Sequence, residues 1–238
     1  MPGRARPSPP LVGAIIVAAG KGRRMGGADK AFLPLAGKPM LAHVGDVFQS
    51  CLAVHRMVIV LARESVGRGW ELARGRSWSK VIEVCPGGER RQDSVLEGLK
   101  RLTGCRWVVI HDGARPCLNA NLIEKGLAEA QRYGAAIAAV PVKDTIKLVG
   151  PEGLILETPK REALWAAQTP QAFRFDIIWD AYQGIDAEVT DDAMLLERKG
   201  YRVKVYPGSY DNIKVTTPED LALAEAILAR QKAGQDTI

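Results

Sequence analysis

The chain has 238 residues, of which 47% are hydrophobic and 25% are charged, a composition typical of a globular protein with a large core. This apolar fraction excludes a disordered chain, the 24 glycines show no collagen period, and four cysteines make no disulfide framework at this length. The net charge of +6 favours anionic partners, and small phosphates are preferred over nucleic acid because no basic run is interleaved with aromatic residues.

The cysteines and the first residues bear on where the protein works. Cys51, Cys85, Cys105 and Cys117 form no CxxC pair and only three histidines are present, so reduced thiols are favoured over a zinc cluster. The apolar run LVGAIIVAAG is too short for a membrane helix, and GKGRRMGG follows it in place of a cleavage site. We therefore predict a cytoplasmic protein without membrane contact, in which residues 1–10 form a flexible tail.

Short apolar runs alternate with amphipathic ones along the rest of the chain. The runs rich in Val and Ile predict strands covered on both faces, at Leu11–Ala19, Met57–Ala62, Lys80–Val84, Trp107–His111, Ala135–Val140 and Tyr201–Tyr206. Strands that alternate with helices favour a mostly parallel sheet with helices on both faces, a Rossmann-like α/β fold.

Segments with the apolar spacing of amphipathic helices lie between these strands. Apolar residues recur on one helical face at Val95, Leu99 and Leu102, and again at Ile123, Leu127 and Ala130. The last helix is predicted to begin at the segment TPED, where Thr217 can cap and Pro218 suits the first turn.

The segment from about 142 to 169 interrupts the alternation. A Gly-Pro-Glu-Gly turn lies between flanks rich in Ile and Leu, which predicts a β-hairpin with a four-residue loop. Exposed apolar flanks need a cover. We expect this arm to mediate dimerisation, the alternative being a hairpin that folds back onto its own domain.

The strongest chemical signal is the glycine-rich loop after the first strand. The stretch GKGRRMGG matches neither a dinucleotide fingerprint, which needs Gly where Met25 stands, nor a Walker loop. It does gather Lys21, Arg23, Arg24 and Lys30 around glycines. Backbone N–H groups and four cations suit a triphosphate, and the alternative is a solvated basic loop.

At this point the sequence resembles a known family. Besides the loop, the chain carries GGERRQDSVLEGL, VIHDGARPC, AVPVKDTIK, WAAQTPQAF, VTDDA and DNIKVTTPEDL in that order. Together these motifs are similar to the 2-C-methyl-D-erythritol 4-phosphate cytidylyltransferase family, over about Leu11 to Arg230. The resemblance implies a single nucleotidyltransferase domain at 11–238 that transfers CMP from CTP to the polyol phosphate and releases pyrophosphate.

The attacking phosphate oxygen is already ionised at neutral pH, so charge stabilisation matters more than a general base. By resemblance, the catalytic residues are Arg24, Lys30 and Lys214. The resemblance assigns CTP binding to a larger set: Ala18, Ala19, Gly20, Gly22, Gly87, Glu89, Arg91 and Ser94.

The acceptor and the metal complete the expected site. Asp112 ends a buried strand at the edge where ligands bind open α/β sheets; it is expected to hold Mg²⁺ or another divalent cation, the alternative being a turn cap. The resemblance assigns acceptor binding to Asp112, Arg115, Thr145, Arg161 and Thr169. In this family the arm crosses to the partner subunit, so a homodimer with arm-exchanged sites is implied.

Three other functions remain open at this point. A cytidylyltransferase for another polyol phosphate, such as ribitol 5-phosphate, would use similar motifs. A molybdopterin guanylyltransferase-like enzyme would share the glycine loop but prefer GTP. A non-catalytic nucleotide- or RNA-binding module would exploit the positive charge but would have no use for Asp112.

Overall fold

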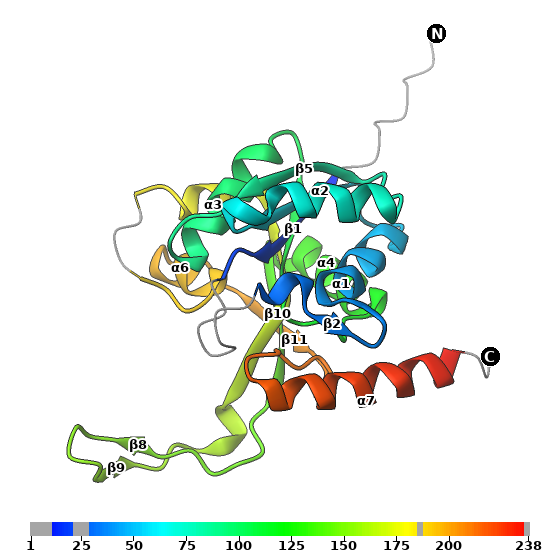
Figure 1. The fold of residues 1–238 in the computed structure, drawn as a ribbon. Helices are drawn as coiled ribbons and strands as arrows, with labels where there is room; N and C mark the ends of the chain where they lie inside the picture. Colours follow the sequence, from blue (N-terminus) through cyan, green and yellow to red (C-terminus); the bar gives the residue numbers. More distant parts are fainter. Residues whose placement is uncertain (1–10, 21–28, 185–187, 236–238) are drawn as a thin grey trace, which may run out of the picture.

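A seven-stranded sheet forms the centre of the computed structural model, which describes residues 11–20, 29–184 and 188–235 (Figure 1). Its strand order is β11-β7-β10-β6-β1-β4-β5. The strands are β1 (Val12–Ala18), β4 (Arg56–Leu61), β5 (Val81–Pro86), β6 (Trp107–Asp112), β7 (Ala135–Pro141), β10 (Trp165–Arg174) and β11 (Lys204–Pro207). The mostly parallel sheet predicted from the sequence is confirmed.

One strand of this sheet is absent from the sequence-based prediction. Strand β10 runs antiparallel to both of its neighbours, β6 and β7, whereas the other neighbouring strands pair in parallel. A parallel alternation gives no reason to expect a strand directly after the arm, and the arm prediction includes its first residues.

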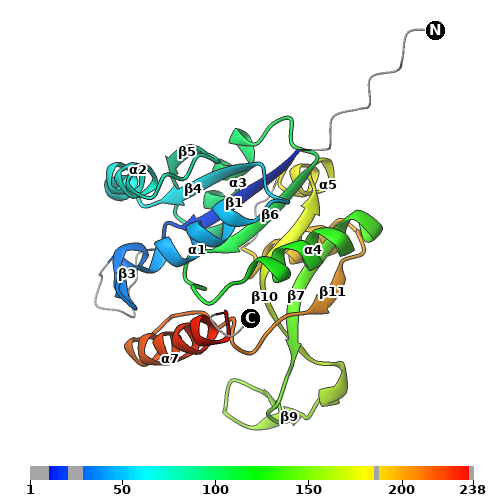
Figure 2. The same ribbon diagram turned by 90° about the vertical axis from the view of Figure 1, so that its right-hand side faces the viewer.

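Helices cover both faces of the sheet. Helices α1 (Met40–Ser50), α2 (Val66–Gly75) and α4 (Ala120–Tyr133) pack on one face, and Figure 2 shows α1 and α4 in front of the sheet. Helices α3 (Arg91–Arg101), α5 (Phe175–Ala181) and α6 (Asp192–Arg198) pack on the other. The predicted faces of α3 and α4 are buried, which confirms them. Within the described residues, no helix has the length and apolar character needed to cross a membrane.

Helix α7 (Pro218–Gln235) lies beside the sheet and buries Ala224 and Ile227 in a small separate core. It begins at Pro218 as predicted and contacts the short hairpin β2 (Pro34–Leu35) and β3 (Lys38–Pro39). Three 3₁₀ turns complete the described elements: Lys30–Phe32, Arg63–Ser65 and Arg161–Ala163.

The strand order reverses at β1: the chain adds β4 and β5 on one side of this strand and then continues with β6 on its other side. That strand pairs with β4 on one side and with β6 on the other. In open α/β sheets, ligands bind beyond the carboxyl ends of the strands at such a switch point. The topology therefore places a binding crevice after Ala18 and Asp112.

An arm projects from the body between β7 and β10 (Figure 1). Its antiparallel strands are β8 (Leu148–Val149) and β9 (Ile155–Glu157). The predicted Gly-Pro-Glu-Gly turn is confirmed, because the N–H of Gly153 donates to the carbonyl of Gly150 at 3.0 Å; the N–H of Gly150 also donates to the carbonyl of Leu154. The arm also returns to the sheet earlier than expected, since β10 begins at Trp165 and pairs with β7 from there.

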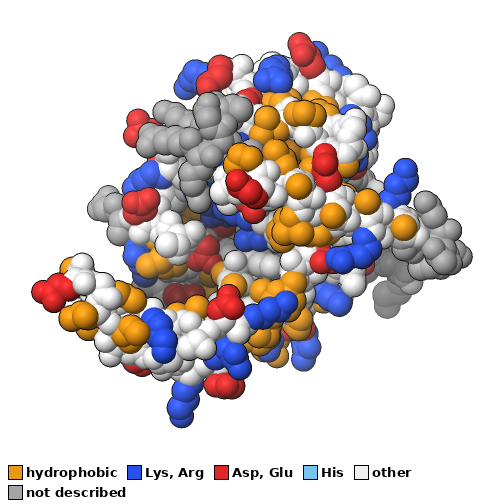
Figure 3. Space-filling view, turned by 60° about the horizontal axis from the view of Figure 1, so that its bottom comes forward, with side chains coloured by type: hydrophobic (Ala, Val, Ile, Leu, Met, Phe, Trp, Pro, Cys, Tyr) orange, Lys and Arg blue, Asp and Glu red, His pale blue; other side chains and the backbone are white. Residues whose placement is uncertain are grey.

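The arm exposes an apolar surface. Leu148, Val149, Leu154, Ile155 and Leu156 are between 48% and 73% exposed, and apolar side chains are visible along the arm in Figure 3. Within one chain the arm does not fold back onto its own core, so the alternative of a self-covered hairpin does not hold for these residues.

Candidate active site

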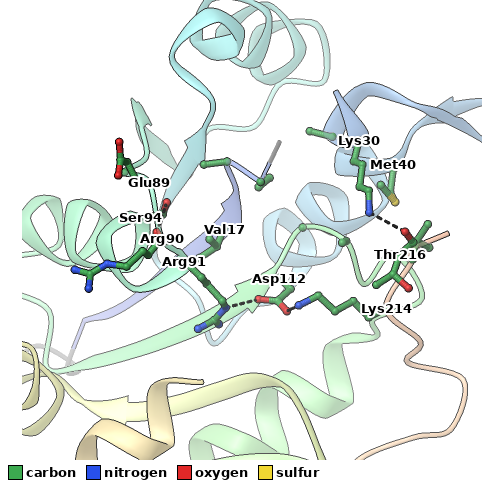
Figure 4. Close-up of a pocket in the computed structure, with 18 residues that line it drawn as sticks. Val17, Lys30, Met40, Glu89, Arg90, Arg91, Ser94, Asp112, Lys214 and Thr216 are labelled. Atoms are coloured by element: carbon green, nitrogen blue, oxygen red, sulfur yellow. Dashed lines mark hydrogen bonds and ion pairs between the residues drawn. The ribbon is translucent and has the colours of Figure 1, made fainter. Parts of the chain in front are cut away.

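A cavity of about 480 Å³ opens at the predicted switch point (Figure 4). Backbone from the end of β1 and from the turn before α3 forms part of its wall, and charged side chains from four segments line it: Lys30, Arg91, Asp112 and Lys214. Its lining includes these predicted residues: Ala18, Ala19, Gly20, Lys30, Glu89, Arg91, Ser94, Asp112 and Lys214. Segments far apart in the sequence are therefore brought together as the sequence motifs predict.

Asp112 lies between two cations at the end of β6. Its Oδ1 accepts a hydrogen bond from Nε of Arg91 at 3.0 Å, and its Oδ2 lies 2.7 Å from Nζ of Lys214. Figure 4 shows the three side chains meeting, whereas Glu89 points away from them. Burial alone would raise the pKa of Asp112, but Arg91 and Lys214 hold that pKa well below its usual range. The carboxylate is therefore charged near neutral pH.

Arg91 contacts a second carboxylate on its other side. Its Nη2 donates to Oδ2 of Asp192 at 2.9 Å, and Tyr182 donates its hydroxyl hydrogen to Oδ1 of Asp192 at 2.5 Å. Asp192 has no exposed surface. Burial acts to lower the pKa of Arg91, but Asp192 and Asp112 raise that pKa well above its ordinary value. Asp192 and Tyr182 were not among the predicted site residues, although the motif VTDDA contains Asp192.

Thr169 is buried beneath the site and holds the backbone of Asp112. Its Oγ1 accepts a hydrogen bond from the Asp112 N–H at 3.0 Å and lies 3.0 Å from Nδ1 of His111. The other ring nitrogen of His111, Nε2, lies 3.2 Å from the carbonyl of Arg115. A carbonyl can only accept, so Nε2 carries the proton and the Thr169 hydroxyl donates to Nδ1.

This arrangement makes His111 a structural group. Burial lowers the pKa of His111 to about 4, and both ring nitrogens have partners. The imidazole is therefore neutral near pH 7 and has no free nitrogen to act as a general base.

Close packing fixes the wall next to α3. A Cβ atom on Gly87 would lie 2.5 Å from both the Ala19 Cβ and the Ser94 Oγ. Only glycine fits there, so Gly87 lets the end of β1 approach the start of α3, although it does not line the cavity itself. On the opposite wall, Nζ of Lys30 donates to the carbonyl of Thr216 at 3.1 Å.

The remaining predicted residues lie elsewhere. Gly22 and Arg24 belong to residues 21–28, outside the described part of the chain. Arg115 is partly buried, does not line the cavity and donates from Nη1 to the carbonyl of Asn212 at 2.7 Å. Thr145 and Arg161 are exposed on the arm, and Arg161 donates to the carbonyl of Lys143 at 3.0 Å. The structure of one chain does not bring Thr145 and Arg161 into the cavity.

The donor set can be compared with the needs of a metal ion. Within the described residues, no cluster of three His, Cys, Asp or Glu side chains forms a metal site of its own. Asp112 supplies a single charged carboxylate whose oxygens retain lone pairs beside Arg91 and Lys214. Mg²⁺ is often bound by one or two carboxylates together with substrate phosphates, so the residues present fit such an ion when phosphates accompany it.

Comparison with known proteins assigns the chain to a family. Residues 12–230 match the sequence profile of 2-C-methyl-D-erythritol 4-phosphate cytidylyltransferase. A protein of that name from Dehalococcoides mccartyi is 51% identical over 92% of this chain and 96% of its own length. One from Pelotomaculum thermopropionicum is 48% identical over 92% of this chain and 95% of its own length.

Solved structures give the same result. The 4-diphosphocytidyl-2C-methyl-D-erythritol synthase from Anaerococcus prevotii superposes with a TM-score of 0.84 at 30% identity, covering 92% of this chain and 96% of its own. The 2-C-methyl-D-erythritol 4-phosphate cytidylyltransferase from Thermus thermophilus superposes with a TM-score of 0.72 at 30% identity, covering 91% and 98%. The chain therefore belongs to the 2-C-methyl-D-erythritol 4-phosphate cytidylyltransferase family of enzymes.

Proposed function

We propose that this protein transfers CMP from CTP to 2-C-methyl-D-erythritol 4-phosphate, giving 4-diphosphocytidyl-2-C-methyl-D-erythritol and pyrophosphate. The observation that carries this proposal is the row Arg91–Asp112–Lys214 at the switch point of the sheet, in a chain of this family. The names of the relatives supply the two substrates, and the charged cavity is suited to their phosphates.

The chemistry follows from the charges of the reactants. An oxygen of the acceptor phosphate attacks the α-phosphorus of CTP, a new P–O bond forms, and the bond to the β-phosphate breaks with departure of pyrophosphate. The attacking monoester is largely a dianion at neutral pH, so no base has to remove a proton. What the site must provide is position and positive charge, because two anions meet in the transition state. Lys30 and Lys214, which both line the cavity, supply that charge, and Arg24 is proposed to act with them.

CTP is proposed to lie across the end of β1. Backbone at Ala18, Ala19 and Gly20, together with Gly22, would approach the phosphates, which is where N–H groups after a strand bind anions. The base and ribose would lie along the turn before α3, against the segment that contains Gly87, Glu89, Arg91 and Ser94.

Asp112 is proposed to hold Mg²⁺ or a similar cation, with phosphate oxygens of CTP as the other ligands. A bound cation would supply charge neutralisation on the phosphates. EDTA is expected to abolish pyrophosphate release, and added Mg²⁺ is expected to restore it. Full activity in EDTA would assign Asp112 to structure alone.

The acceptor is proposed to bind between two subunits of a homodimer. Arg115 and Thr169 belong to the body, whereas Thr145 and Arg161 lie on the exposed arm, outside the cavity of their own chain. The apolar side chains of the arm need a cover. A two-fold dimer would bury both arms and bring each to the partner's cavity. The four cysteines are free thiols, in keeping with the cytoplasmic location proposed from the sequence.

A substrate matrix tests the function. Pyrophosphate release is measured with CTP, UTP, ATP and GTP, each against 2-C-methyl-D-erythritol 4-phosphate, ribitol 5-phosphate and no acceptor. The proposal expects release with CTP and the methylerythritol phosphate only. Release with ribitol 5-phosphate or GTP would support one of the other nucleotidyltransferases, and binding of CTP without release in any pair would contradict an enzyme.

A further inference from the structure

We propose that Asp192 and Tyr182 are positioning residues for this reaction: they hold the guanidinium of Arg91 against Asp112. This inference rests on the proposed function and deepens it, because it assigns a role to the segment VTDDA, which none of the steps above uses. It is carried by the chain of contacts Tyr182–Asp192–Arg91–Asp112.

Burying the polar groups of this row of contacts costs free energy, which indicates that they have a role. Asp192, at the start of α6, has no exposed surface and Tyr182, at the end of α5, is 3% exposed, yet both side chains carry polar atoms. A buried carboxylate usually contributes less stability than a well-packed apolar residue would. The charge of Asp192 is tolerated here because Arg91 and Tyr182 each occupy one of its oxygens.

Hydrogen bonds to the body of the protein anchor the segment just before α6 and so hold Asp192 in place. The N–H of Val189 donates to Oε1 of Gln92 on α3 at 3.0 Å. Oδ2 of Asp191 accepts from Nε2 of Gln171 on β10 at 2.9 Å, and its Oδ1 caps α6 at Met194. Contacts with α3 and β10 thus fix the start of α6. Because Asp192 lies at this start, its hydrogen bond to Arg91 also fixes the position of the guanidinium.

The consequence for the cavity concerns Asp112. Arg91 is a fork with donors in fixed directions; one donor is bound to Asp192, so the position of its Nε beside Asp112 is determined. Lys214 holds the other oxygen from the opposite side. The carboxylate plane is thereby set before any substrate binds. Without Asp192, Arg91 could turn towards CTP phosphates or rotate Asp112 with it.

Two conservative variants test the role directly. Asp192→Asn keeps the shape and removes the charge, and it is expected to lower kcat about 10- to 100-fold, as is usual for residues that orient a charged ligand. KM for CTP is expected to change less than kcat, because the cavity walls are intact. Tyr182→Phe removes one hydrogen bond and is expected to lower kcat about fivefold.

A double-variant cycle separates positioning from simple support of the fold. Arg91→Gln leaves Asp192 buried and unpaired, so both Tm and kcat should fall. Adding Asp192→Asn removes that unpaired charge, and Tm should recover towards the wild-type value. If Asp192 acts through Arg91, kcat should remain as low as in Arg91→Gln alone.

A matched control comes from a carboxylate remote from the cavity. Asp46 accepts hydrogen bonds from Arg76 at 2.7 Å and from the indole of Trp78 at 2.9 Å. Asp46→Asn should lower Tm without changing kcat.

Three results would overturn the inference. These are unchanged kcat in Asp192→Asn and Tyr182→Phe, equal losses from Asp192→Asn with and without Arg91, or a recovery of kcat together with Tm in the double variant. Each applies to a wild-type protein that releases pyrophosphate from CTP and the methylerythritol phosphate. A wild-type protein without that activity would overturn the proposed function as well.

Discussion

Asp112 combines burial, a low pKa and two cationic partners, and each of these follows from its place at the end of β6. Arg91 comes from the start of α3 and Lys214 from the loop before α7, so the pair is assembled by the fold and not by neighbouring sequence. Because the fold fixes these charges before a substrate arrives, we propose that the site is preorganised for the phosphates.

Lys214 provides the first prediction at this scale. Its ammonium lines the cavity and its side chain is 43% exposed, so Lys214→Ala should remove charge without opening the core. We expect kcat to fall by about 10²-fold or more while Tm changes little. Steady-state kinetics and thermal unfolding measure both. The control is Lys125→Ala on the exposed side of α4, which should leave kcat unchanged; near-normal turnover of Lys214→Ala would contradict the charge-stabilisation account.

The pH dependence of the reaction provides the second prediction. Because its pKa lies well below the ordinary value, Asp112 stays ionised across the working range. The acidic limb of kcat/KM should instead follow the acceptor phosphate, with a loss of activity below about pH 6 as its dianion takes a proton. A phosphonate analogue with a higher second pKa should move this limb upward. A limb that stays in place with the analogue would show that a group on the enzyme controls it.

At the residue scale, the sequence motifs indicated several residues that the fold brings together, although their roles stay predictions. Asp112, Lys214 and the backbone after β1 meet as the motifs indicate. Arg91 and Asp192 are 101 positions apart in the sequence. No local sequence pattern predicts which arginine pairs with which buried carboxylate. Thr169 was expected at the acceptor; its hydrogen bonds to Asp112 and His111 become visible only in three dimensions.

At the scale of elements, helix α3 approaches β1 through a glycine. A Cβ on Gly98 would lie 2.6 Å from Cγ2 of Ile15, a residue with no exposed surface. The absence of a side chain at Gly98 therefore allows the close approach between α3, the helix that carries Arg91, and β1, the strand that leads to the glycine loop.

Gly98→Ala tests this packing. The added methyl group must displace Ile15 or the helix, so we expect a loss of about 1–3 kcal/mol in the free energy of unfolding, measured by urea denaturation. Gly67→Ala in α2 is the control, because its Cβ would meet nothing within 4 Å. That change should stabilise the protein by up to about 1 kcal/mol. Equal effects of the two changes would show that helix propensity, and not packing against β1, decides the outcome.

Element prediction from sequence succeeded for buried strands and amphipathic helices and failed at β10. Residues 165–169 were assigned to the arm because their sequence continues an irregular stretch after a predicted hairpin. In the structure Trp165, Ala166 and Ala167 pair with the end of β7. The sequence of β10, an antiparallel strand inserted between β6 and β7, has no alternation of polar and apolar residues that would distinguish it from a loop.

At the scale of the whole molecule, the arm is the part that the single chain does not explain. It projects from the body with its apolar side chains exposed (Figures 1 and 3). Thr145 and Arg161 lie on the arm and do not line the cavity that they are proposed to serve. The proposed two-fold dimer, in which each arm would cover the partner and complete its site, would explain both facts. The sequence predicted a projecting hairpin from its turn and apolar flanks; the geometry of exchange rests on the family resemblance.

We propose that CMP transfer takes place at sites built from two chains, which complementation between two inactive variants can test. Arg161→Ala and Lys214→Ala, each inactive alone, are mixed, unfolded and refolded together, and pyrophosphate release from CTP and 2-C-methyl-D-erythritol 4-phosphate is measured. In a mixed dimer one site carries both changes and the other carries neither. Random pairing makes half of the dimers mixed, so about a quarter of wild-type activity should return. If subunit exchange is demonstrated and the mixture stays inactive, the arm serves its own chain and the claim is contradicted.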